Sequence, residues 1–192
     1  MKRATILHDT DSSPSEHWFP WMKVYLEQNG YNVFAPLLPN HIKPNRHIYE
    51  DFLKDSGWDF TNNIIVGHSS GATTILNLLQ SDWFPPVNTC VLAGTFLNQK
   101  LTKDADWVIN GQFDNLFLDS YDPEIILKKC SKFYFVHGSN DPYCDINDAK
   151  ELSKKINGTF ITIKNGHHLG EPSGVLELPQ ITAVLEKDHI LD

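Results

Sequence analysis

The feature that most constrains the fold is an apolar run that enters a turn between two glycines. Residues 63–66 read Asn-Ile-Ile-Val, which is typical of a buried strand, and apolar residues recur at helical spacing over 75–79. Between them, residues 67–71 read Gly-His-Ser-Ser-Gly and match Gly-x-Ser-x-Gly, a pattern in which a serine stands at the apex of a strained turn between a strand and a helix. The stretch therefore predicts such a turn and makes Ser69 the candidate nucleophile.

Short apolar runs alternate with helical patterns along the rest of the chain. Strands are predicted at 5–8, 32–35, 89–93, 132–137 and 159–164. Helices are expected from Ser13 to Gly30, where Ser-Pro-Ser-Glu provides a capping box, and over 45–54, 121–130, 145–156 and 175–187. This alternation indicates an α/β fold with a sheet of about six mostly parallel strands and helices on both faces. A chain of 192 residues fits a single domain, 1–192.

Composition argues against several classes of partner. The formal net charge of -8 would repel a phosphate backbone, so no nucleic-acid partner is expected. No apolar run approaches the length that a bilayer requires, and residues 1–8 enter an apolar strand rather than a cleavable signal peptide. We therefore expect a cytoplasmic protein with no membrane partner. The three cysteines are widely spaced, which predicts reduced thiols rather than a disulfide framework or a zinc site. No metal and no cofactor are expected.

A serine hydroxyl becomes a strong nucleophile when a base accepts its proton and an anion holds that base in place. In α/β folds with this turn the three groups follow in the order Ser, Asp or Glu, His. Asp141 follows the penultimate predicted strand and His167 follows the last, so both should reach the edge of the sheet where Ser69 lies. His168 is the nearest alternative base if the loop register differs. Asp145 is the alternative acid, but it is better placed to cap the helix that starts there.

Acyl transfer also needs donors for the developing oxyanion. Such donors are commonly the amide after the nucleophile and an amide from the loop after the first strand, here Ser70 and Thr10. Cys144 is a weaker candidate nucleophile because nothing places it on a strained turn. Residues 95–120 lack sustained periodicity, and they either roof the active site or form an irregular surface excursion.

Three segments carry a family resemblance: Gly-His-Ser-Ser-Gly-Ala at 67–72, Glu-His-Trp-Phe-Pro-Trp at 16–21 and Asn-Gly-His at 165–167. With them, nearly the whole chain resembles the small lidless serine hydrolases of the YdeN and retinoblastoma-binding protein 9 family. The resemblance implies an α/β-hydrolase fold without a separate cap domain, a triad at Ser69, Asp141 and His167, and hydrolysis of small carboxyl esters.

The chain also departs from this family. Members often carry His-Gly or Pro-Gly in the oxyanion loop, where this chain has His8 and Asp9. The Leu-x-Cys-x-Glu sequence associated with retinoblastoma binding is absent, so the resemblance implies no such protein partner. Our leading hypothesis is a carboxylesterase-type serine hydrolase that acts on small acyl esters through an acyl-enzyme intermediate. The alternatives are a binding protein on a hydrolase scaffold with an idle triad, which the Asp9 carboxylate favours, and an acyltransferase that uses the same residues.

Overall fold

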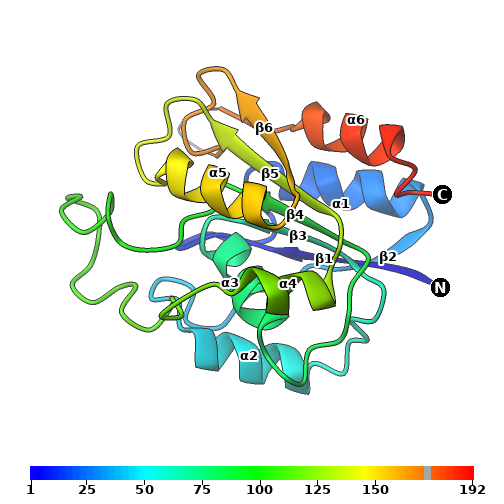
Figure 1. The fold of residues 1–192 in the computed structure, drawn as a ribbon, viewed down its shortest axis with the longest axis horizontal. Coiled ribbons are helices and arrows are strands. Elements are labelled where there is room, and N and C mark those ends of the chain that lie inside the picture. The colour runs from blue at the N-terminus through cyan, green and yellow to red at the C-terminus, as the bar shows by residue number, and fades with distance from the viewer. Residues whose placement is uncertain (171–173) are drawn as a thin grey trace.

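The computed structural model describes residues 1–170 and 174–192, and its strands form a parallel sheet (Figure 1). Six strands pair in the order β2-β1-β3-β4-β5-β6. Their bounds are β1 Lys2–Leu7, β2 Tyr31–Phe34, β3 Ile64–His68, β4 Thr89–Ala93, β5 Phe133–Gly138 and β6 Thr159–Ile163. Every neighbouring pair is parallel, so all the strands have their carboxyl ends at the same edge of the sheet.

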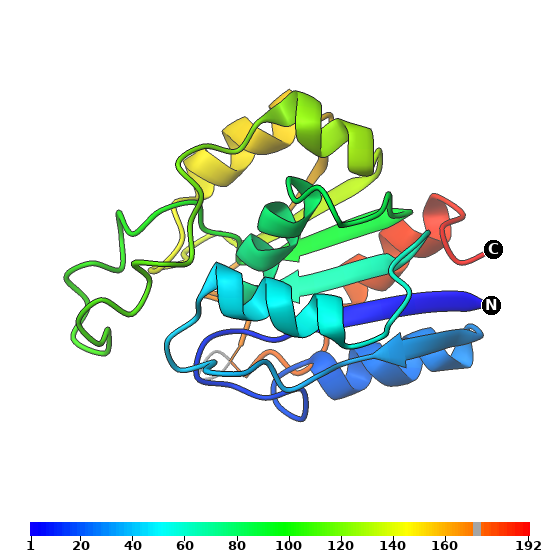
Figure 2. The same cartoon turned by 90° about the horizontal axis from the view of Figure 1, so that it is seen from below.

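Helices cover both faces of this sheet (Figures 1 and 2). The helices α1 Phe19–Gln28 and α6 Pro179–Lys187 pack on one face. The other face carries α2 Arg46–Asp55, α3 Ser70–Leu79, α4 Pro123–Lys129 and α5 Ile146–Lys155. Among the residues that the structure describes, no helix has the length and apolar character that a membrane span needs.

The central strands are mostly apolar because each of their sides faces a core. In β3, Ile65 packs with the four-helix side, while Ile64 and Val66 pack with α1 and α6. Successive side chains of a strand point to opposite faces, so a strand buried on both faces needs an unbroken apolar run rather than an alternating one. This explains why the sequence locates these strands within a few residues.

Two helices begin later than the sequence predicts. The capping-box residues Ser13 and Glu16 are bonded to each other, since the Ser13 amide donates to the Glu16 carboxylate over 2.6 Å. These residues form a turn and not the start of a helix. His17 has a positive φ of 54°, which is not a helical conformation, and α1 begins only after it. At the other end of the chain, α6 begins at Pro179, because a proline disfavours helical backbone at the residue before it.

Residues 95–120 form no helix or strand and lie beyond the carboxyl ends of the strands, away from both termini (Figures 1 and 2). The segment nevertheless has an apolar anchor. Phe96, Phe113 and Leu116 are buried in a small cluster with Cys144 from the loop after β5. The segment is therefore packed onto the edge of the sheet where the predicted active-site residues lie.

Candidate active site

Ser69 lies at the apex of the turn between β3 and α3, as the motif predicts. Its backbone is strained, with φ of 53° and ψ of −118°, a conformation that costs about 1–3 kcal/mol for a residue with a side chain. The Ser69 amide donates to the Ala93 carbonyl over 2.8 Å, which ties the turn to β4. A Cβ atom on Gly71 would lie 2.2 Å from the Leu7 carbonyl oxygen, so only glycine fits there.

A chain of hydrogen bonds connects Ser69 to His168 and Asp141. The His168 Nε2 atom lies 2.9 Å from the Ser69 Oγ atom, and its Nδ1 atom lies 2.9 Å from the Asp141 Oδ2 atom. A carboxylate can only accept, so Nδ1 donates to Asp141 and leaves Nε2 free to accept the serine proton. The arrangement is that of a Ser-His-Asp triad.

The Asp141 carboxylate is held in place from two sides. Its Oδ1 atom accepts the backbone amides of Tyr143 at 2.9 Å and Cys144 at 3.1 Å, while Oδ2 accepts from His168. Burial alone would raise the pKa of Asp141, but the hydrogen bond and charge of His168 and the two amides together lower it below its ordinary value. The group is therefore an anion that can orient an imidazole and stabilise its protonated form.

His167, the base predicted from sequence, is not the histidine that contacts Ser69. Its side chain is exposed, and its backbone amide donates to the Asn140 side-chain oxygen over 2.9 Å. The loop turns sharply here, with a φ of 46° at His167 and a hydrogen bond from the Leu169 amide to the Gly166 carbonyl. This turn directs His167 outward and the next residue inward, so the alternative considered from sequence, His168, is the one that meets Ser69 and Asp141.

Of the two acids considered from sequence, the structure brings Asp141 to the histidine ring. Asp141 contacts the histidine, whereas the Asp145 side chain caps α5 by accepting the Asn147 amide over 2.9 Å. Asp145 also pairs with Lys100 from residues 95–120.

The Cys144 thiol, the other nucleophile considered from sequence, donates to the Gly94 carbonyl over 2.9 Å. Burial raises the pKa of this thiol well above its ordinary value, which disfavours the thiolate that a cysteine nucleophile would need.

The triad opens onto a cavity of about 150 Å³. Its lining residues are Asp9, Thr10, Ser69, Phe96, Thr102, Trp107, Phe113, Tyr143, Cys144 and His168. Phe96, Thr102, Trp107 and Phe113 belong to residues 95–120, so this segment forms part of the cavity wall. Trp18 is fully buried away from the cavity, and its indole nitrogen donates to the Leu169 carbonyl over 2.9 Å.

The two predicted oxyanion donors lie close to the nucleophile. Ser70 is the first residue of α3, and Thr10 lines the cavity beside Ser69. The Thr10 hydroxyl donates to the Ser70 hydroxyl oxygen over 2.9 Å, which links the loop after β1 to the start of α3. The role of the two amides stays a prediction.

Asp9, which departs from the family pattern, is partly buried between two imidazoles. Its Oδ2 atom lies 3.5 Å from His17 Nε2, and its Oδ1 atom lies 3.6 Å from His68 Nδ1. Burial alone would raise the pKa of Asp9, but His68 and His17 together hold it well below its ordinary value. The lowered pKa keeps the Asp9 carboxylate ionised beside the two rings. Sequence reasoning missed both partners, because nothing in the spacing of residues 9, 17 and 68 signals that they meet.

The family follows from comparison of the whole chain with known proteins. The model of the serine hydrolase family matches residues 4–187. The chain belongs to the serine hydrolase family. Among curated proteins, YdeN of Bacillus subtilis is 24% identical over 188 residues, which cover 96% of this chain and 94% of YdeN. Membership of the YdeN-like group therefore agrees with the resemblance noted in the sequence.

Solved structures confirm that this serine hydrolase has the α/β-hydrolase fold. The crystal structure of YdeN from B. subtilis matches with a TM-score of 0.86 at 22% identity and covers 99% of this chain and 100% of that one. Est1E from Butyrivibrio proteoclasticus, in a structure with bound ferulic acid, matches with a TM-score of 0.70 at 14% identity over 99% of this chain and 88% of its own. At these identities the likeness is one of fold.

Proposed function

We propose that this serine hydrolase is a carboxylesterase-type enzyme that cleaves small acyl esters through a Ser69, His168 and Asp141 triad. The observation that carries the proposal is the unbroken hydrogen-bond chain from Asp141 through His168 to Ser69, with the serine on the wall of a cavity. The lowered pKa of Asp141 favours its ionised form, and a His168 ring that donates to it from Nδ1 has Nε2 available to accept the Ser69 proton.

In the first half of the reaction, Ser69 Oγ attacks the ester carbonyl while its proton passes to His168 Nε2. The carbonyl oxygen becomes an oxyanion, which the amides of Ser70 and Thr10 would bind. Asp141 stabilises the imidazolium. When the tetrahedral intermediate collapses, the bond to the leaving oxygen breaks, the alcohol takes the proton from His168, and the acyl group remains on Ser69.

In the second half, water replaces the alcohol. His168 accepts a proton from the water as the water attacks the acyl carbon, and it returns that proton to Ser69 as the carboxylic acid leaves. Hydrolysis of the acyl-enzyme intermediate therefore needs no reactant other than water. Transfer of the acyl group to another acceptor would use the same residues, so added alcohols belong among the acceptors that are tested.

The cavity favours a small acyl group. Its volume of about 150 Å³ is below the roughly 300–1,000 Å³ of sites for drug-sized ligands. Phe96, Trp107, Phe113 and Tyr143 supply aromatic surface, which suits an apolar or planar group. Because the structural neighbour Est1E was solved with ferulic acid, aromatic acyl esters belong beside acetyl and butyryl esters among the substrates. We place the activity in the cytosol, where three unpaired buried cysteines stay reduced.

A fluorophosphonate probe, which reacts with activated serines, tests the proposal together with turnover of those esters. We expect labelling and turnover in the unmodified protein and neither in Ser69→Ala. Labelling that persists in Ser69→Ala would exclude Ser69 as the nucleophile. An intact protein that neither reacts with the probe nor turns over any ester would instead favour the binding-protein alternative.

A further inference from the structure

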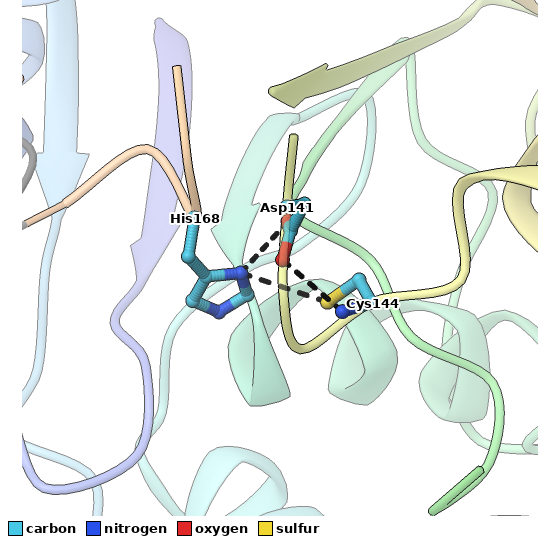
Figure 3. A group of neighbouring side chains, drawn as sticks. All are labelled: Asp141, Cys144 and His168. Atoms are coloured by element: carbon cyan, nitrogen blue, oxygen red, sulfur yellow. Dashed lines mark hydrogen bonds and ion pairs between the residues drawn. The ribbon is translucent and has the colours of Figure 1, made fainter. Parts of the chain in front are cut away.

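A third side chain, that of Cys144, lies against the His168 and Asp141 pair and has no part in the proposed hydrolysis. Figure 3 shows the Cys144 sulfur beside the His168 ring, next to the Asp141 carboxylate. The Cys144 Sγ atom lies 3.6 Å from His168 Nδ1, and Nδ1 lies 2.9 Å from Asp141 Oδ2. One ligand atom from each of the three residues can be chosen so that all lie within 4.8 Å of one another.

We propose that Cys144, His168 and Asp141 form a binding site for a thiophilic divalent cation such as Zn²⁺. A thiol, an imidazole and a carboxylate are the ligand types that zinc takes in proteins, whereas Mg²⁺ and Ca²⁺ prefer oxygen alone. The donors come from two loops, Asp141 and Cys144 after β5 and His168 after β6. No local motif in the sequence predicts this set of three ligands.

Two of the three donor separations are close to those of tetrahedral coordination, and all three donor atoms lie within 4.8 Å of one another. Bonds of about 2.0 to 2.3 Å from zinc to nitrogen, oxygen and sulfur place neighbouring donors about 3.4 to 3.6 Å apart. The separation of Cys144 and His168 already has this value, at 3.6 Å. The pair of His168 and Asp141, now 2.9 Å apart, would open by about half an ångström as the cation replaces the proton between them.

Two further features support the site. The Asp141 carboxylate is fixed by the amides of Tyr143 and Cys144 through its other oxygen, and such outer hydrogen bonds orient metal ligands. Cys144 and His168 also line the cavity, so a cation has a route in and a water can complete its coordination. The burial of Cys144, which keeps the free thiol protonated, does not exclude binding, because coordination deprotonates a thiol.

Binding of the cation would prevent His168 from acting as a base. This effect rests on the proposed function, whereas the binding itself does not. The cation takes His168 Nδ1, and the proton there moves to Nε2. The Cys144 proton leaves to solvent. Nε2 then donates to Ser69 and can no longer accept its proton, so Ser69 is not activated.

Cobalt binding tests the site directly, without reference to turnover. Co²⁺ bound to a thiolate gives a ligand-to-metal charge-transfer band in the near ultraviolet. We expect this band when Co²⁺ is added to the chelator-treated protein, its loss on adding Zn²⁺, and no effect of Mg²⁺. Cys144→Val and Cys144→Ser should both lack the band, and Cys90→Ala and Cys130→Ala are the matched controls that keep it.

Asp141→Asn should weaken Co²⁺ binding by at least about tenfold, the lower end of the cost of losing even an outer partner of a ligand. Absence of the band in the unmodified protein, or its persistence in a Cys144 variant with native circular dichroism, would overturn the site. Zn²⁺ should also block fluorophosphonate labelling in the unmodified protein, with the block lost in both Cys144 variants. If Co²⁺ binds but Zn²⁺ does not block labelling, the predicted effect on His168 is overturned. If the metal-free protein shows neither labelling nor ester turnover, the proposed function alone is contradicted.

Discussion

The His68 ring donates its Nε2–H to the backbone carbonyl of His168 over 2.6 Å. The residue that precedes the nucleophile thus anchors the loop that carries the candidate base. The two rings lie 4.9 Å apart between centroids, and the other nitrogen of His68 faces Asp9 at 3.6 Å. A buried connection therefore runs from the loop after β1, through the end of β3, to the loop after β6.

His68→Phe should impair turnover without abolishing substrate binding. Phenylalanine fills the same space but cannot donate to the His168 carbonyl, and a displacement of about 1 Å in a catalytic group can cost roughly 100-fold in rate. We expect kcat to fall about 10- to 100-fold, with KM changing much less. His68→Gln retains a donor and should recover part of the loss. Equal kcat values in the phenylalanine variant and the unmodified protein would show that this anchor is dispensable.

Replacing each of the two adjacent histidines separates their roles. His168→Ala removes the base and should lower kcat/KM for a small ester by about 10⁴-fold, the scale seen when a triad is disrupted. His167→Ala, the matched control, removes only an exposed side chain and keeps the backbone amide that bonds Asn140, so it should leave the rate within about threefold. The reverse ranking would restore His167 as the base.

The sequence predicts the scaffold better than it predicts the contacts. Strands buried on both faces are mostly apolar, so β3, β4 and β5 can be recognised in the sequence as short apolar runs. The turn at Ser69 is equally local, because its glycines are needed within a few residues of the strained position. Asp141 could be expected near Ser69 because it lies in the loop after a strand whose carboxyl end is at the same edge as Ser69.

The base could not be chosen from sequence because two adjacent histidines follow the same strand. Which one faces Ser69 depends on the path of the loop, and Gly138 and Asn140 from the neighbouring strand and loop set that path. The contacts of Asp9 with His17 and His68, and of Cys144 with His168, are also long-range. They depend on tertiary packing and leave no periodic or motif signal.

Asp9→Asn tests whether the partly buried Asp9 carboxylate stabilises the fold as an anion. The pKa of Asp9 is lowered in the folded state, so its contribution to the free energy of unfolding is present above the ordinary pKa of about 3.9 and disappears as the pH falls through the lowered value. Near pH 5 the variant should be less stable by on the order of 1–3 kcal/mol. That difference should shrink steadily below about pH 4.

Urea unfolding of both proteins at several pH values measures this difference. Asp11→Asn, at an exposed position in the same loop, controls for the loss of one negative charge. A difference for Asp9→Asn that stays constant or grows in acid would show that the carboxylate is not stabilised as an anion.

Gly138, the last residue of β5, controls the position of the histidine loop. A Cβ atom there would lie 2.0 Å from the His167 carbonyl oxygen and 2.7 Å from its amide nitrogen. Both contacts are with backbone, so neither atom can rotate away. The loop approaches β5 this closely only because residue 138 has no side chain.

Gly138→Ala should therefore push the loop outward and carry His168 away from Ser69. We expect kcat to fall at least about 100-fold and the free energy of unfolding to fall by about 1–3 kcal/mol, the usual range for overpacking. Gly57→Ala is the control: its φ of 71° strains an alanine, but no heavy atom lies within 4 Å of the new Cβ. It should lose about 1–2 kcal/mol of stability and keep its activity. Full activity in Gly138→Ala would mean that the loop can move without displacing the base, so the fixed position of His168 would not depend on this contact.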